Sequence, residues 1–133
     1  MIWVNCKELK PVSPYQFYTT VLPIYGITPT PGDSSSILRD RFYAAKQGDG
    51  KPLILVVDEV DDLTGTADTR NVLYDLLQSD VTLLLMSNVF DWVERSGDSR
   101  LQSRAQLGNR LVFVNCSREF NTIDTISKKA LSD

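Results

Sequence analysis

A length of 133 residues and a mass of 15.0 kDa fit a single domain. The composition is 42% hydrophobic and 23% charged, which excludes a chain that is disordered by composition. The net charge of -3 argues against a protein that binds nucleic acid through overall charge, and the lack of any histidine excludes histidine catalysis and histidine metal ligands.

The sequence also limits the compartment in which the protein is expected. No apolar run approaches the roughly 18 residues of a membrane helix, and no basic-then-apolar export signal opens the chain. The two cysteines, Cys6 and Cys116, each end an apolar run, and we expect buried free thiols rather than a disulfide or a metal site. We therefore expect a cytoplasmic protein, or a nuclear one in a eukaryote, without a membrane partner.

The predicted elements alternate between strands and helices. In chain order, they are a strand at 2–6, a helix at 13–26 that Pro23 bends or ends early, a helix at 34–48, a strand at 53–57, a helix through 72–78, strands at 81–86 and 111–116, and a helix at 120–131. The two middle strands are almost uninterrupted apolar runs, typical of parallel strands buried on both faces. The alternation indicates an α/β fold with a mainly parallel sheet flanked by helices.

The strand at 53–57 runs into two adjacent carboxylates, Asp58 and Glu59. This pattern is typical of P-loop ATPases, in which the first acid holds Mg²⁺ through its water shell and the second polarises the attacking water. Open α/β sheets bind ligands beyond the carboxyl ends of their strands, where both residues are expected. The alternative is a solvated strand end that leads into an acidic turn.

The strand at 81–86 ends in a small polar pair, Ser87 and Asn88. In a parallel sheet this pair emerges at the same edge as Asp58, where the amide of Asn88 can orient a water or a γ-phosphate. The alternative is that Asn88 only caps the turn before Asp91.

Several stretches resemble a known family. They read, in order, IWVNC with the following SPY, PLILVVDEVDDL, NVLYDLLQ, LLLMSN with the following DWVER, and RLQSR. They resemble the second strand and its helix, the Walker B strand, the helix after it, the sensor 1 strand, and the arginine-finger element of AAA+ ATPases, in the branch of origin-recognition and replication-licensing initiators. The chain thus resembles a truncated AAA+ core, as one partial domain over residues 1–133.

The resemblance implies roles for individual residues. Asp58 would coordinate Mg²⁺, Glu59 would activate water, and Asn88 would be sensor 1. Arg104 would be the finger presented to a neighbouring subunit's nucleotide, because a fixed guanidinium fork neutralises developing phosphate charge. Arg100 is the less favoured candidate for contact with the nucleotide. ATP and Mg²⁺ are cofactors by this resemblance only, and the alternative for both arginines is a solvated helix face.

The sequence also departs from the family. No GxxxxGK[ST] motif occurs, and its nearest approach, residues 48–51, precedes a strand, whereas a phosphate cradle follows a strand and opens a helix. The helical lid with its sensor 2 arginine and a winged-helix DNA reader also have no counterpart here. We therefore expect no tightly bound nucleotide. Without the P-loop strand, the strand at 111–114 must pair directly with that at 81–86, or another chain must fill the gap, and exposed edges favour association.

Three functional hypotheses follow. The first is a non-catalytic AAA+-like module that binds a related initiator subunit or a second copy of itself. The second is a fragment of an active initiator ATPase, and the third is an α/β binding domain unrelated to ATP. DNA contact is expected only through a partner or a local basic patch, whose candidate residues are mixed with acids along the chain: Lys7, Lys10, Arg39, Arg41 and Lys46.

Overall fold

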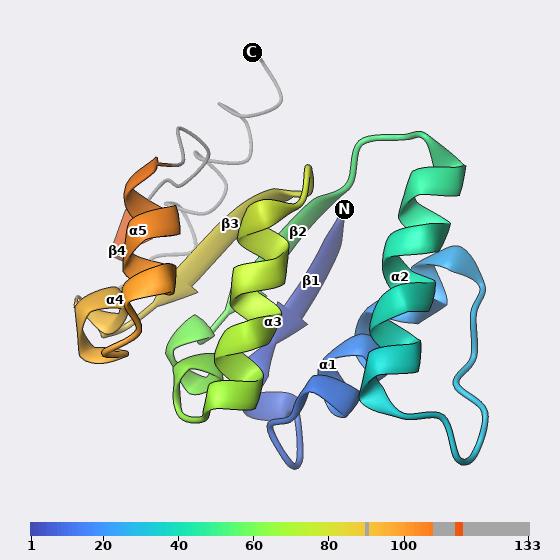
Figure 1. Ribbon diagram of the computed structural model, residues 1–133, viewed down its shortest axis with the longest axis horizontal. Coiled ribbons are helices and arrows are strands. Elements are labelled where there is room, and N and C mark those ends of the chain that lie inside the picture. The colour runs from blue at the N-terminus through green and yellow to red at the C-terminus, as the bar shows by residue number, and fades with distance from the viewer. Residues whose placement is uncertain (90, 108–113, 116–133) are drawn as a thin grey trace.

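A computed structural model describes residues 1–89, 91–107 and 114–115 (Figure 1). Its parallel strands lie in the consecutive order β1 (Ile2–Asn5), β2 (Ile54–Asp58), β3 (Thr82–Ser87) and β4 (Val114–Asn115). The helices are α1 (Pro14–Val21), α2 (Ser35–Asp49), α3 (Ala67–Gln78), α4 (Trp92–Arg95) and α5 (Ser99–Leu107), with 3₁₀ turns η1 (Cys6–Glu8), η2 (Leu22–Tyr25) and η3 (Val60–Thr64). The predicted α/β fold with a parallel sheet is confirmed.

Local sequence signals set the ends of the helices. Ser13 caps α1, because its Oγ accepts a hydrogen bond from the N–H of Gln16 at 3.2 Å, and Pro14 occupies the first turn. As predicted, Pro23 ends this helix early, in the turn η2, which closes at Gly26 with a left-handed backbone (φ 70°). The second helix begins after its cap Ser34, as expected, but runs slightly past its predicted end at residue 48.

The described helices pack against one face of the sheet. Consecutive parallel strands joined by right-handed crossovers place all their helices on the same side. One core accordingly joins alternate strand residues to residues of α1, α2, α3, α4 and α5; the strand residues are Val4, Leu55, Val57, Leu83 and Leu85. Val56 and Met86, which alternate with these, are buried but lie outside that core.

The strands differ from the prediction in three ways. The first strand ends at Asn5, one residue early, and its predicted last residue, Cys6, begins the turn η1. The middle strands begin and end one residue later than expected, so Asp58 and Ser87 are the last residues of β2 and β3. In β2 the residues Leu55–Val57 are all buried, as predicted, but Thr82 is exposed and Leu84 half-buried, so β3 is not buried on both faces along its whole length. The face of the sheet that carries Thr82 and Leu84 is therefore less enclosed at β3 than the apolar sequence indicated.

The pairing of the last strand distinguishes the two arrangements that the AAA+ resemblance left open. The described part of this strand, β4, pairs directly with β3, with Met86 opposite Val114 and Ser87 opposite Asn115. The edge of β3 is thus paired by a strand of the same chain. The predicted helix at 120–131 and the strand residues outside 114–115 lie outside the described residues. Among the described residues, no helix is both long and apolar enough to cross a membrane.

Candidate functional site

The candidate site lies at the edge where β2 and β3 end. Asp58 closes β2, Ser87 closes β3, and the exposed Asn88 follows at once. Because the two strands are parallel and adjacent, their last residues lie at one edge of the sheet. The structure thus brings together three of the strand-end residues that the sequence singled out.

The carboxylate of Asp58 is held by the backbone that follows it. Its Oδ1 accepts a hydrogen bond from the N–H of Glu59 at 2.8 Å, and Asp58 lies opposite Asn5 at the end of β1. This bond fixes the direction of the carboxylate at the strand end. An oriented oxygen donor of this kind suits a hard cation such as Mg²⁺.

Glu59 lies in a strained backbone conformation and is paired with a cation of the same chain. Its φ of 54° and ψ of 44° are left-handed, the only positive φ of a non-glycine residue among those described. Its carboxylate lies 3.5 Å from the Nζ of Lys7, with 16% of the Glu59 side chain and 64% of the Lys7 side chain exposed. The sequence did not indicate this partner, because η1 and η3 are brought together only by the fold.

A second contact joins the acidic turn to β3. Ser87 donates a hydrogen bond from its Oγ to Oδ1 of Asp61 at 2.8 Å, and the same Oγ accepts one from the N–H of Val89 at 2.9 Å. Ser87 is buried, so both bonds are shielded from water. Sequence reasoning found the small polar residue at the strand end but missed Asp61, whose role depends on where η3 places it.

Four carboxylates surround a buried thiol at this edge. Burial, and to a smaller extent the charges of four acids, together raise the pKa of Cys6 to about 12; in decreasing order the acids are Asp62, Asp58, Asp61 and Glu59. Burial and the charge of Asp61 also raise the pKa of Asp62, while Lys7 lowers it. Cys6 is free and buried, as predicted, whereas Cys116 lies outside the described residues.

Of the two arginines that the sequence singled out in α5, Arg100 has a described side chain. The Nη2 of Arg100 donates a hydrogen bond to Oδ1 of Asn71 at 2.9 Å, and its guanidinium lies 4.9 Å from the ring centre of Tyr74. Both partners belong to α3, so Arg100 packs along the neighbouring helix. Arg104 lies in the same helix, but its side chain is outside the described part of the structure.

The described residues offer oxygen donors for a metal but make no complete nucleotide site. The loop at 48–51 ends α2 and leads into β2, with Gly50 as the left-handed cap, so it presents no helix N-terminus to phosphate. Within the described ranges, no group of three or more carboxylate or thiol side chains is arranged to hold a metal ion.

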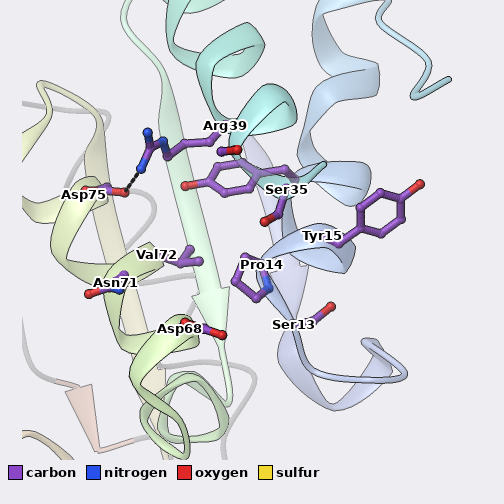
Figure 2. A pocket seen from close by; sticks show the side chains of 11 residues that line it. Ser13, Pro14, Tyr15, Ser35, Arg39, Asp68, Asn71, Val72 and Asp75 are labelled. Atoms are coloured by element: carbon purple, nitrogen blue, oxygen red, sulfur yellow. Dashed lines mark ion pairs between the residues drawn. The ribbon is translucent and has the colours of Figure 1, made fainter. Parts of the chain in front are cut away.

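A separate cavity of about 370 Å³ lies between the helices. It is formed by the first turns of α1 and α2 and one side of α3, and Figure 2 shows Arg39 reaching across it to Asp75, with 3.7 Å between the two charged groups. Its other polar lining residues include Ser13, Ser35, Asp68 and Asn71. A cavity of this size is in the range of small-molecule sites.

Most of the candidate basic patch is neutralised within the chain. Lys7 pairs with Glu59, Arg39 with Asp40 and Asp75, Arg41 with Asp33, and Lys46 with Asp80. These pairs favour a solvated, mixed surface over a binding face for nucleic acid.

No family model matches the sequence, and no curated protein matches it either.

Proposed function

We propose that this chain is an AAA+-like module of the replication-initiator type that is inactive alone and acts at an ATPase interface with a related subunit. The observation that carries the proposal is the meeting of Asp58, Ser87 and Asn88 at the ends of adjacent parallel strands. In P-loop ATPases the Walker B acid and the sensor 1 residue occupy this relation, and the resemblance of the sequence motifs assigns them to Asp58 and Asn88.

The edge of the sheet where β2 and β3 end, with Asp58, Glu59, Asp61 and Asp62, is called the acidic edge below. Its contacts support the proposal that the chain is inactive alone. The carboxylate of Glu59 pairs with Lys7, whereas a water-activating acid needs an oxygen available to the attacking water. The loop at 48–51 cannot replace a phosphate-binding loop where it stands. Under this proposal the acids are inherited features of the fold.

The role at an interface rests on Arg104. This residue follows Arg100 by one helical turn in α5, and the resemblance gives it the position of the finger. A finger acts on nucleotide held by another subunit, so it does not require a phosphate site in its own chain. The proposed partner is an initiator ATPase that carries its own P-loop, and any contact with DNA would be made through that partner.

The test adds this chain to a P-loop-containing AAA+ initiator ATPase and measures the partner's rate of ATP hydrolysis. We expect wild-type chain to raise that rate by about tenfold or more, since a finger contributes about 10³ or more to kcat in cognate pairs. Arg104→Ala should abolish the effect, and Arg104→Lys should not restore it, because lysine lacks the planar fork.

Arg100→Ala is the matched control, since it removes the same charge one turn earlier in the same helix. It should leave the stimulation in place and lower only the stability of this chain, through the lost contacts to Asn71 and Tyr74. The proposal is wrong if the partner's rate is unchanged by wild-type chain, or if Arg104→Ala behaves as wild type.

A second candidate is an α/β binding domain unrelated to ATP. The cavity between α1, α2 and α3 favours it, because this cavity is lined by other residues than the strand ends at the acidic edge. The remaining hypothesis, a piece of an active initiator ATPase, predicts a GxxxxGK[ST] motif in the codons upstream of Met1. Reading those codons distinguishes it from the module proposed here.

A further inference from the structure

The cavity between α1, α2 and α3 carries opposite charges on two of its walls. Asp68 and Asp75 line it from α3, and Arg39 lines it from α2. The two acids are about two helical turns apart, so they share one face of α3. Figure 2 shows Arg39 and Asp75 directed toward each other across the upper part of the cavity, with Asp68 lower down. A ligand in this cavity therefore meets groups of both charges.

The ion pair between Arg39 and Asp75 leaves both groups with unused hydrogen-bonding capacity. Nη1 of Arg39 lies 3.7 Å from Oδ2 of Asp75, which is too long for a hydrogen bond. The hydrogen bonds of Arg39 to Asp40 are also long, at 3.4 Å. Burial raises the pKa of Asp75, while the charges of Arg39 and Arg100 lower it to a smaller extent. The carboxylate of Asp75 is therefore incompletely compensated.

A second polar group without a partner lies near this carboxylate. Tyr18 lines the same cavity and is 1% exposed, and among the described residues its hydroxyl has no hydrogen-bond partner. Burial raises the pKa of Tyr18, and the charge of Asp75 adds to this effect, so the hydroxyl and the carboxylate are close in space. Native proteins rarely leave a buried hydroxyl without a partner, so this hydroxyl indicates a place for a further polar group.

A primary ammonium group suits this place, because its three N–H donors can serve the carboxylate of Asp75 and the hydroxyl of Tyr18 together. An ammonium alone would be repelled by the guanidinium of Arg39. A carboxylate on the same ligand removes this conflict, since a guanidinium binds a carboxylate through two parallel hydrogen bonds. The side chain of Arg39 is 45% exposed and can turn from Asp75 toward such a group.

We propose that this cavity binds a free α-amino acid with an apolar side chain. The ammonium group lies at Asp75 and Tyr18, and the carboxylate lies at Arg39. The side chain lies between Pro14 and Val72, which line the cavity and which Figure 2 shows facing one another. The volume of about 370 Å³ is near the lower end of the range of small-molecule sites, as expected for so small a ligand.

This proposal goes beyond the role at an ATPase interface and does not depend on it. None of the residues that hold the ligand belongs to the acidic edge or to α5. The two proposals can therefore fail separately.

The test titrates the full chain with L-leucine and follows the backbone amide signals of the cavity residues by NMR. We expect saturable binding with a Kd of about 1 mM or tighter. Leucinamide lacks the carboxylate and 4-methylpentanoate lacks the ammonium group, so each loses one charge-assisted contact and should bind at least about tenfold more weakly. Leucinamide also represents the N-terminus of a peptide, which is thereby distinguished from a free amino acid.

Two variants test the residues at the ammonium group. Asp75→Asn should weaken leucine binding at least about tenfold, whereas the matched control Asp40→Asn, which removes the other acid paired with Arg39, should not weaken it. Tyr18→Phe should weaken leucine binding without lowering the urea midpoint of unfolding, because the hydroxyl that it removes makes no hydrogen bond within the described chain. A purely structural hydroxyl would not affect binding.

The proposal is wrong if leucine does not bind, or if leucinamide or 4-methylpentanoate binds as tightly as leucine. It is also wrong if Asp75→Asn and Tyr18→Phe leave the Kd of leucine unchanged. All of these measurements use this chain without nucleotide or partner, so their failure would leave the ATPase-interface proposal to its own test.

Discussion

The pKa of the buried Cys6 thiol reflects the negative charge at the acidic edge. The residue lies in η1, directly after β1, and its environment combines burial with the charges of four carboxylates at and just after the end of β2. Both effects disfavour the thiolate, which is the reactive form of cysteine. The sequence predicted a buried free thiol but not the surrounding carboxylates, because they come from a segment more than fifty positions away.

We predict that Cys6 is unreactive in the folded protein. In a Cys116→Ser background, a pKa of about 12 leaves a thiolate fraction at pH 8 on the order of a thousandfold below that of an ordinary thiol. Modification by a thiol-reactive disulfide should therefore be at least about a hundredfold slower in buffer than in concentrated urea. Equal rates under the two conditions would show that the thiol is accessible and that the edge is not built as described.

The hydrogen bonds of Ser87 predict a loss of stability on truncation. Ser87→Ala removes the donor to Asp61 and the acceptor for the N–H of Val89 in a buried setting. We expect the free energy of unfolding in urea to fall by about 1–2 kcal/mol. The control Ser103→Ala, at an exposed position of α5, should change it by less than about 0.5 kcal/mol. A loss no larger than that of the control would contradict the role of Ser87 as the link between η3 and β3.

Among the elements, helices were predictable where their caps are local. Ser13 with Pro14, and Ser34, mark helix starts because each cap bonds a backbone N–H three residues on. The strand ends were displaced by one residue, since a polar residue such as Asp58 continues the ladder when its neighbour strand extends equally far. The sequence predicted η3 only as an acidic turn. The turn begins with a left-handed backbone at Glu59, and this conformation usually falls on glycine, so the residue type did not indicate it.

The turn η3 also predicts a pH dependence of stability. Burial and the charge of Asp61 raise the pKa of Asp62 in the folded state, so folding favours its protonated form. That contribution is fully present below the ordinary pKa of an aspartate and is lost as the pH rises through the raised value. At pH 7 the ionised Asp62 is therefore unfavourable to the folded chain.

Asp62→Asn should accordingly raise the unfolding temperature at pH 7, and the gain should vanish near pH 3, where the wild-type carboxyl is protonated. The comparison is Asp40→Asn on α2, whose side chain is 73% exposed and is expected to have little effect at either pH. Thermal unfolding of both variants across this pH range checks the sign. A gain that persists unchanged at pH 3 would mean that packing, rather than charge, is responsible.

For the molecule as a whole, the sheet order follows from the sequence only in part. The pattern of alternating strands and helices predicts parallel pairing, but it leaves open whether the last strand joins β3 or leaves a gap for another chain. The pairing of Met86 with Val114 closes the sheet within one chain, so the edge of β3 does not by itself require a second one. Association with a related subunit or with a second copy therefore rests on the interface proposed for α5 and stays a prediction.

We predict that the isolated chain binds ATP–Mg²⁺ with a Kd no tighter than about 1 mM and does not hydrolyse it, because a phosphate-binding loop and its lysine supply most of the phosphate contacts in such sites. The nearest glycine-rich stretch ends α2 and leads into a strand, so its amides do not open a helix towards a ligand. The variant Lys7→Ala tests whether the ion pair alone keeps the chain inactive, since it releases the carboxylate of Glu59 from Lys7. Hydrolysis should remain absent in this variant, because freeing the acid supplies no site for the phosphates. Titration calorimetry and a phosphate-release assay test both points. A micromolar Kd, or turnover that disappears in Glu59→Gln, would show that the acidic edge is a working nucleotide site.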